Sequence, residues 1–227
     1  MADTSESAAP LSPPAARERW RLDFRGRVQG VGFRPWIYRL ATEEGLAGHV
    51  GNDLRGAFVE LEGEPAAIAR FLARVDTEAP ALVQIAGCEE RALPASGERA
   101  FRILSSRTGG EQRAEIAPDA ATCPDCLREL SDPADRRYRY PFINCTNCGP
   151  RYSIVRGLPY DRALTTMAAF TMCPRCQAEY DDPADRRFHA QPNACPDCGP
   201  RLWLSGPDGQ PIPDPDPVAA VWRLLGA

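Results

Sequence analysis

The strongest signal in this chain is a cysteine pattern that occurs twice, with an offset of fifty residues. In each copy, two Cys-x-x-Cys pairs are separated by eighteen residues, and the second pair is followed by Gly-Pro-Arg. We call residues 123–151 the first repeat and residues 173–201 the second repeat. The cysteines are Cys123, Cys126, Cys145 and Cys148 in the first repeat and Cys173, Cys176, Cys195 and Cys198 in the second. Two such pairs at this separation are typical of a tetrahedral site with four thiolate ligands.

Four thiolates leave no coordination position open for water or substrate, so the pattern predicts one structural zinc ion in each repeat. The repeats hold few apolar residues, and metal binding would therefore supply much of their folding free energy. Isolated zinc-finger peptides gain about 10–16 kcal/mol on binding zinc at neutral pH. Two alternatives stay open. Redox chemistry uses a single Cys-x-x-Cys pair, whereas four are present here, and an iron–sulfur cluster also accepts four thiolates.

The remaining cysteine and the two histidines stand apart from this pattern. Cys88 falls in a predicted strand, where we expect a buried, apolar side chain. His49 and His189 are too isolated from the cysteine pairs to be first-choice metal ligands.

A second repeated string, Asp-Pro-Ala-Asp-Arg-Arg, lies between the cysteine pairs of each repeat, at residues 132–137 and 182–187. Its arginines could neutralise the thiolate-rich sites, interact with the C-terminus of a helix, or dock a neighbouring domain. It could also be a turn of solvated charges. The sequence alone favours the solvated turn.

The residues before the repeats alternate between strand-like and helix-like patterns. Helices are expected at about 34–44, between Pro35 and Gly45, and at 64–77, where Ile68, Phe71, Leu72 and Val75 share one face. Strands are expected at 20–28, 46–52, 56–63, 81–90 and 99–106. The order is the β-α-β-β-α-β arrangement of ferredoxin-like folds. The predicted fold class is therefore α+β, with two small four-cysteine zinc-finger units following a ferredoxin-like domain.

A glycine-rich loop, Gly-Arg-Val-Gln-Gly-Val-Gly-Phe-Arg, joins the first predicted strand to the first helix at residues 26–34. Such a loop can aim successive backbone N–H groups at one anion beside a helix N-terminus. Arg34 at its end can add a bidentate contact to a phosphate. A tight turn that carries a surface arginine is the alternative.

The loop sequence VQGVGFR, together with GHVGNDLRGAFVELEG at residues 48–63, resembles the signatures of the acylphosphatase family. That resemblance implies hydrolysis of the carboxylic–phosphoric anhydride of acyl phosphates, without a metal. It implies that Arg34 and Asn52 are catalytic. Arg34 would bind the phosphoryl group and Asn52 would orient the attacking water. The implied phosphate-binding residues are Gln29, Gly30, Val31, Gly32, Phe33 and Arg34.

The combination of this domain with the cysteine repeats resembles the N-terminal portion of the HypF-type carbamoyltransferases of [NiFe]-hydrogenase maturation. VGFRPWIYRLA, CPDCLREL and FINCTNCGPRYSI carry the resemblance. It implies that carbamoyl phosphate or another acyl phosphate is cleaved here, for ATP-dependent carbamoyl transfer to the C-terminal cysteine of a HypE-type partner. The adenylation and transfer domains of the family would lie outside these residues. A self-contained acylphosphatase with a zinc-ribbon appendage and a non-catalytic zinc-ribbon adaptor are the other interpretations.

Composition excludes several other functions. The net charge of −4 argues against a dedicated nucleic-acid binder. All 27 basic residues are arginine, which excludes a Schiff-base lysine and a lysine-containing phosphate loop. Neither a signal peptide nor an apolar run long enough for a membrane span is seen, so a cytoplasmic protein is expected. The expected divisions are a disordered tail (1–17), an acylphosphatase-like domain (18–107), two zinc-finger units (117–155 and 167–204), and a linker with the start of a further domain (205–227).

Overall fold

The computed structural model of the protein describes residues 17–107 and 113–226, which form two compact units. The first unit comprises residues 17–29 and 33–115, and the second comprises residues 116–226 together with residues 30–32. Apart from Arg17, the predicted disordered tail lies outside the described residues.

The first unit is built around one five-stranded sheet with the strand order β4-β1-β3-β2-β5. Its elements are β1 (Glu18–Arg27), α1 (Phe33–Glu43), β2 (Ala47–Asp53), β3 (Gly56–Gly63), α2 (Pro65–Thr77), β4 (Gln84–Leu93) and β5 (Phe101–Ile103). Neighbouring strands are antiparallel, except that β5 runs parallel to β2 at the sheet edge. This confirms the predicted ferredoxin-like arrangement, with β5 as an added edge strand.

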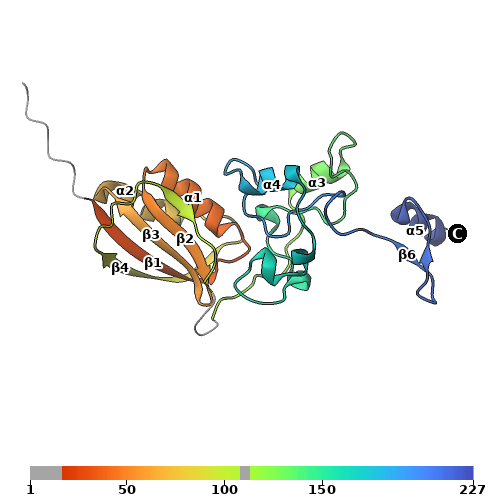
Figure 1. Ribbon diagram of the computed structural model, residues 1–227, viewed down its shortest axis with the longest axis horizontal. Helices are drawn as coiled ribbons and strands as arrows, with labels where there is room; N and C mark the ends of the chain where they lie inside the picture. Colours follow the sequence, from red (N-terminus) through yellow and green to blue (C-terminus); the bar gives the residue numbers. More distant parts are fainter. Residues whose placement is uncertain (1–16, 108–112, 227) are drawn as a thin grey trace, which may run out of the picture. The chain divides into compact units, whose positions relative to one another are not determined.

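Both helices of this unit cover the same face of the sheet (Figure 1). Helix α1 buries Ile37 and Leu40, and α2 buries Ile68, Phe71 and Val75, at the spacing of one helical face. The predicted apolar face of α2 is confirmed at those three positions, while Leu72, its fourth predicted member, is only half-buried. The apolar core therefore lies between the helices and the sheet.

The opposite face of the sheet carries charged side chains, one of which is deeply buried. Glu62 of β3 is 1% exposed, and its carboxylate accepts hydrogen bonds from the amide and hydroxyl of Ser96 and from the amide of Gly97, each of 2.8 Å. Burial alone would raise the pKa of Glu62, but these hydrogen bonds lower it to about 2. The carboxylate is thus a fixed, ionised part of the fold.

The edge strand β4 corrects one expectation. Cys88 lies opposite Phe24 of β1 in the sheet register, but its side chain is exposed. The prediction of a buried cysteine was wrong because β4 is an edge strand that pairs on one side alone, so half of its surroundings are open. Strand propensity alone does not indicate which strand becomes the edge.

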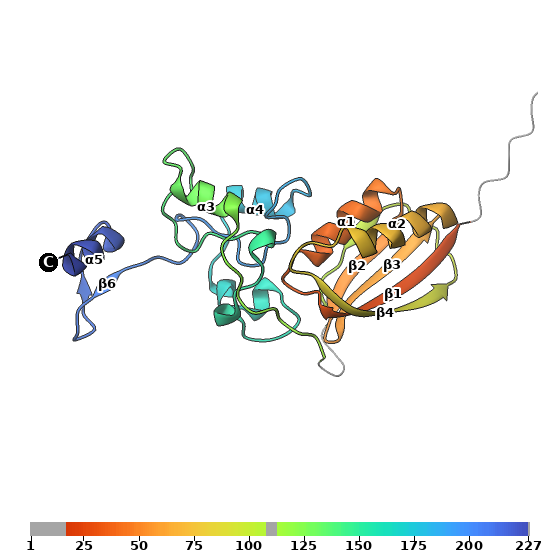
Figure 2. The ribbon, with the colours of Figure 1, turned by 180° about the vertical axis from the view of Figure 1, so that it is seen from behind.

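The second unit contains little regular secondary structure. Its elements are α3 (Pro124–Ser131), η1 (Thr146–Cys148), η2 (Tyr152–Ile154), η3 (Arg162–Leu164), η4 (Thr166–Ala169), α4 (Pro174–Asp181), β6 (Leu204–Ser205), β7 (Pro211–Ile212) and α5 (Pro217–Leu225), where η marks short 3₁₀ turns. Figure 2 shows α3 and α4 as two short helices with long irregular connections. Such a chain must obtain its stability from something other than helix or sheet packing.

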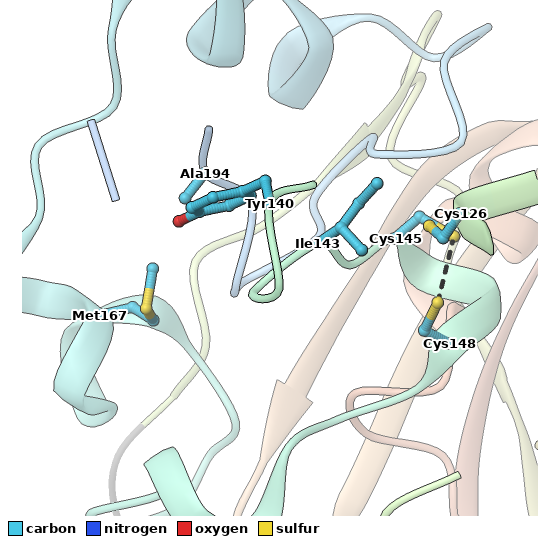
Figure 3. Close-up of a cluster of buried hydrophobic side chains, with 7 residues drawn as sticks. All are labelled: Cys126, Tyr140, Ile143, Cys145, Cys148, Met167 and Ala194. Atoms are coloured by element: carbon cyan, nitrogen blue, oxygen red, sulfur yellow. Dashed lines mark hydrogen bonds between the residues drawn. The ribbon is translucent and has the colours of Figure 1, made fainter. Parts of the chain in front are cut away.

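The two repeats start in the same way. Cys123 and Cys173 each occupy the position before a helix, with Pro124 or Pro174 in the first turn, where a missing N–H costs nothing. A small core includes three of the cysteines (Figure 3), and its members are Cys126, Tyr140, Ile143, Cys145, Cys148, Met167 and Ala194. Because three of its seven members are cysteines of the first repeat, this core overlaps the metal site of that repeat.

The last helix has a typical N-terminal cap. Asp216 accepts a hydrogen bond of 3.0 Å from the Ala219 amide, and Pro217 is the first helical residue. In the described part of the chain, no helix has both the length and the apolar character needed to cross a membrane.

Candidate active site and metal centres

The second part of the glycine-rich loop, Gln29–Arg34, has the backbone geometry of an anion-binding turn. Gly30 and Gly32 have φ angles of 73° and 80°, in the left-handed region that favours glycine. Helix α1 begins directly after them, at Phe33, so the amides of Phe33 and Arg34 lie in its first turn. Those amides and the positive end of the helix dipole favour a bound anion here.

The loop is held in place by the side chain of Gln29, a role that sequence reasoning missed. This side chain is fully buried, and its Nε2 donates to the carbonyl oxygens of Asp53 and Gly56, at 2.7 Å each. The acceptors lie at the turn between β2 and β3, which Asp53 shapes by accepting from the Gly56 amide at 3.1 Å. This structural role of the side chain is additional to the predicted contribution of the Gln29 main-chain N–H to phosphate binding.

Arg34 lies in the first turn of α1, and only 7% of its surface is exposed. Its Nη1 donates to Oγ of Ser106 at 3.3 Å. The sequence gives no signal for this contact, since the serine lies 72 residues further along the chain. A guanidinium held inside the fold is preorganised to bind a phosphoryl group.

Asn52, near the end of β2, is 1% exposed, and neither its Nδ2 nor its Oδ1 has a hydrogen-bond partner among the described residues. Leaving a buried polar group unpaired costs about 1–3 kcal/mol, so such a group indicates a place for water or a ligand. Its backbone carbonyl accepts from the Arg107 amide at 2.9 Å.

Three hydrogen bonds connect the three predicted parts of the site. Gln29 joins the loop to Asp53, the neighbour of Asn52. Arg34 bonds to Ser106, whose neighbour Arg107 bonds to the backbone of Asn52. Gln29, Arg34 and Asn52 are therefore linked through neighbouring residues within the first unit.

In the second unit, the cysteines gather into the two predicted groups of four. The ligand atoms of each group lie within 4.8 Å of one another. Individual Sγ–Sγ separations are 3.6 Å for Cys123–Cys145, 3.9 Å for Cys145–Cys148 and 3.8 Å for Cys173–Cys195. A tetrahedron with Zn–S bonds of about 2.3 Å has edges of about 3.8 Å. The donor set and its spacing thus fit structural zinc, and no histidine of the described residues joins either group.

The arginines of the repeated hexapeptide cross from each repeat to the other. Arg136 of the first repeat donates to Cys176 Sγ of the second at 3.2 Å, and Arg137 pairs with Glu179 through Nη1 at 3.0 Å. In the opposite direction, Arg186 donates to Cys126 Sγ at 2.9 Å, and both Arg186 and Arg187 pair with Glu129. We call Arg136/Arg137 and Arg186/Arg187 the crossed arginine pairs.

These contacts overturn the interpretation of the hexapeptide as a solvated turn. Arg137 is 2% exposed and Arg187 is 3% exposed. The side chain of Arg137 also donates to the Ala194 carbonyl, and that of Arg187 donates to the Asn144 carbonyl. The alternative in which the arginines neutralise thiolate-rich sites is the one that the structure supports.

The crossed pairs also change the protonation of their partners. Burial raises the pKa of the Cys176 thiol to about 12, and the hydrogen bond from Arg136 acts against that rise. Burial would likewise raise the pKa of Glu179, but Arg137 and Arg136 lower it to about 2. The guanidinium groups therefore favour the anionic forms that zinc ligation and ion pairing require.

Comparisons with known protein families match both units. The family model described as Acylphosphatase matches residues 20–103, and the model described as HypF finger matches residues 122–155 and 172–205. The acylphosphatase of Synechococcus sp. (strain WH7803) is 36% identical over 94 residues, which cover 93% of that protein and 41% of this chain.

Longer relatives match almost the entire chain. Carbamoyltransferase HypF2 of Cupriavidus necator is 55% identical over 212 residues, or 92% of this chain and 26% of that protein. The crystal structure of full-length HypF in a phosphate- and nucleotide-bound form superposes with a TM-score of 0.88 and 42% identity, covering 95% of this chain and 28% of that one. The structure of T. kodakarensis HypF superposes with a TM-score of 0.78 and 40% identity, covering 92% of this chain and 26% of that one. The chain thus spans about a quarter of the length of these relatives.

Proposed function

Because the chain belongs to the acylphosphatase family through residues 20–103 and is similar to the HypF carbamoyltransferases over most of its length, we propose that its first unit hydrolyses acyl phosphates. The observation that carries the proposal is the buried side-chain amide of Asn52, which has no hydrogen-bond partner in the described part of the chain and is linked through neighbouring residues to Gln29 and to Arg34. A buried amide with both polar atoms unsatisfied is suited to hold a water molecule beside a bound phosphoryl group.

In the proposed reaction, the main-chain amides of Gln29–Phe33 and the guanidinium of Arg34 bind the phosphoryl oxygens. Asn52 orients a water molecule whose oxygen attacks phosphorus. The bond between phosphorus and the acyl oxygen breaks, and its electron pair leaves with the carboxylate. The products are a carboxylate, inorganic phosphate and the proton that the water gives up. Positioning and charge stabilisation are the main requirements of such a transfer, so no general base has to be assigned.

We infer that the physiological substrate is carbamoyl phosphate, which would give carbamate and phosphate. In the complete proteins of the HypF type, ATP-dependent adenylation of carbamate and transfer to a HypE-type partner would follow, in parts that these 227 residues do not span. We place the protein in the cytoplasm, where reducing conditions keep the eight ligand thiols free to bind zinc.

The two zinc sites take no part in this chemistry. Four thiolates in each site complete a tetrahedral coordination sphere, so the metal has no position for substrate. When bound, zinc supplies folding free energy to the second unit. The hydrolytic reaction depends on residues of the first unit and of the glycine-rich loop.

Phosphate release from carbamoyl phosphate and from benzoyl phosphate tests the proposal. Asn52→Ala and Arg34→Gln should each lower kcat by about 10²–10³-fold, the usual effect of losing one preorganised electrostatic group. Arg39→Gln is the matched control, because Arg39 is an exposed arginine on the same helix. Absence of turnover in the wild-type chain, or turnover unaffected by Asn52→Ala, would contradict the proposal and favour the zinc-ribbon adaptor.

A further inference from the structure

The crossed arginine pairs carry an inference that is independent of the proposed hydrolysis. In both repeats, the sulfur that receives the guanidinium belongs to the second cysteine of the helical pair, Cys126 or Cys176. In both repeats, the carboxylate that pairs with the arginines lies three residues later, at Glu129 or Glu179. The same interaction is therefore made twice, once in each direction.

We propose that each crossed arginine pair is a positioning part of the zinc site in the opposite repeat. A site of four thiolates and one Zn²⁺ carries a net charge of −2, and a guanidinium hydrogen bond to sulfur stabilises that charge. The planar fork of arginine can reach the sulfur and the nearby carboxylate together, which fixes the orientation of the helix that bears the cysteine. Groups that orient metal ligands in this way typically change metal affinity by about 10–100-fold.

Geometry favours this role over a general contribution to packing. Arg136 and Arg186 contact the ligand sulfurs of the opposite repeat directly, at 3.2 Å and 2.9 Å. Arg137 also donates to Cys176 Sγ, at 3.5 Å. The arginines emerge from the turn between the cysteine pairs of their own repeat, so a repeat contributes four ligands to one zinc ion and two guanidinium groups to the other.

Single substitutions at the less buried member of each pair test the proposal. The side chain of Arg136 is 16% exposed and that of Arg186 is 21% exposed, so Arg136→Gln and Arg186→Gln are expected to fold. Zinc would be withdrawn from the whole chain by competition with a chromophoric chelator. Alkylation of the released cysteines, mapped by mass spectrometry, would identify which site has lost its metal.

Each substitution is expected to weaken zinc binding in the opposite repeat. Arg136→Gln should weaken zinc binding about 10–100-fold at Cys173, Cys176, Cys195 and Cys198, with a much smaller effect on the site of its own repeat. Arg186→Gln should do the converse. Arg128→Gln, which removes an exposed arginine from α3, should change neither site.

Three outcomes would overturn the proposal: equal weakening of both sites, weakening confined to the substituted repeat, and no change in either affinity. Equal weakening would indicate that the arginines serve only the stability of the fold. Far-ultraviolet circular dichroism of the zinc-loaded variants provides the check that each one is folded. Hydrolysis in the first unit is not part of the readout, so failure here would leave the proposed function untouched.

Discussion

The side chain of Gln29 makes two hydrogen bonds to distant backbone carbonyls that no sequence pattern indicates. Gln29→Ala would leave the carbonyls of Asp53 and Gly56 without their donor. We expect a loss of about 1–3 kcal/mol in the free energy of unfolding, together with a lower kcat because the loop would no longer be fixed beside Asn52. Chemical denaturation and phosphate release measure the two effects. Gln84→Ala, at an exposed position of β4, is the control, and equal effects of the two substitutions would contradict this role.

The buried carboxylate of Glu62 makes stability depend on acid pH. Its pKa is lowered from an ordinary value near 4.5 to about 2, so the stabilisation that it provides is present above about pH 4.5. That stabilisation is lost as pH falls towards 2, because the folded protein must then take up the proton. Glu62→Gln should lower stability at neutral pH and flatten its decline between pH 4.5 and 2, as measured by denaturant unfolding. Glu64 is exposed and lies two residues later, so Glu64→Gln should keep the wild-type dependence of stability on pH.

The sequence could predict site residues where a local motif names them, and could not where contacts are distant. Motif resemblance assigns Arg34 and Asn52, and in the structure the two are linked through Ser106 and its neighbour Arg107. The bonds of Gln29 and Ser106 connect positions 24 and 72 residues apart, respectively, and no periodic pattern encodes such a pairing.

For secondary-structure elements, the junction between the glycine loop and α1 offers a sharp test. Gly32→Ala should lower turnover strongly, because a side chain at φ 80° is strained by about 1–2 kcal/mol and the loop would shift to relieve that strain. Gly45→Ala is the matched control. Gly45 also has a positive φ, of 68°, but it lies beyond the other end of α1 and has open space around it. Both variants should lose similar stability, and Gly32→Ala alone should lose kcat. Equal turnover in the two variants would contradict a role for the loop in binding phosphate.

Periodicity predicted the helices and strands of the first unit well, because apolar faces at spacings of 3.6 and 2 residues leave a direct trace in sequence. It did not predict which strand forms the edge, and so misjudged Cys88. Pairing order depends on contacts between distant segments, which a local pattern does not contain.

For the protein as a whole, the crossed arginine pairs predict that the two zinc sites bind cooperatively. Emptying one site should loosen the turn of that repeat, which carries the arginines that contact the other site, so during titration with a chelator the one-zinc form should be less populated than two independent sites would give. Native mass spectrometry measures the populations directly. In Arg136→Gln, by contrast, the one-zinc form should accumulate. A statistical distribution of zero, one and two zinc ions in the wild-type chain would contradict this coupling.

The repeat in the sequence predicted two metal sites and their ligands, because cysteine spacing is a local property. It did not predict the destination of the hexapeptide arginines. That destination depends on how the two repeats pack, and each hexapeptide by itself is typical of an exposed charged turn.

The exchange of arginines between the repeats has a consequence for dissecting this protein. Many tandem zinc modules can be cut out, shuffled or grafted one at a time, because each is self-sufficient. A single repeat isolated from this chain would carry two arginines without the cysteine and glutamate that they contact. Its own metal site would lack the two arginines that the other repeat supplies. The two repeats together are therefore the smallest part that could be moved to another protein. A substitution in either repeat would first affect the metal site of the other.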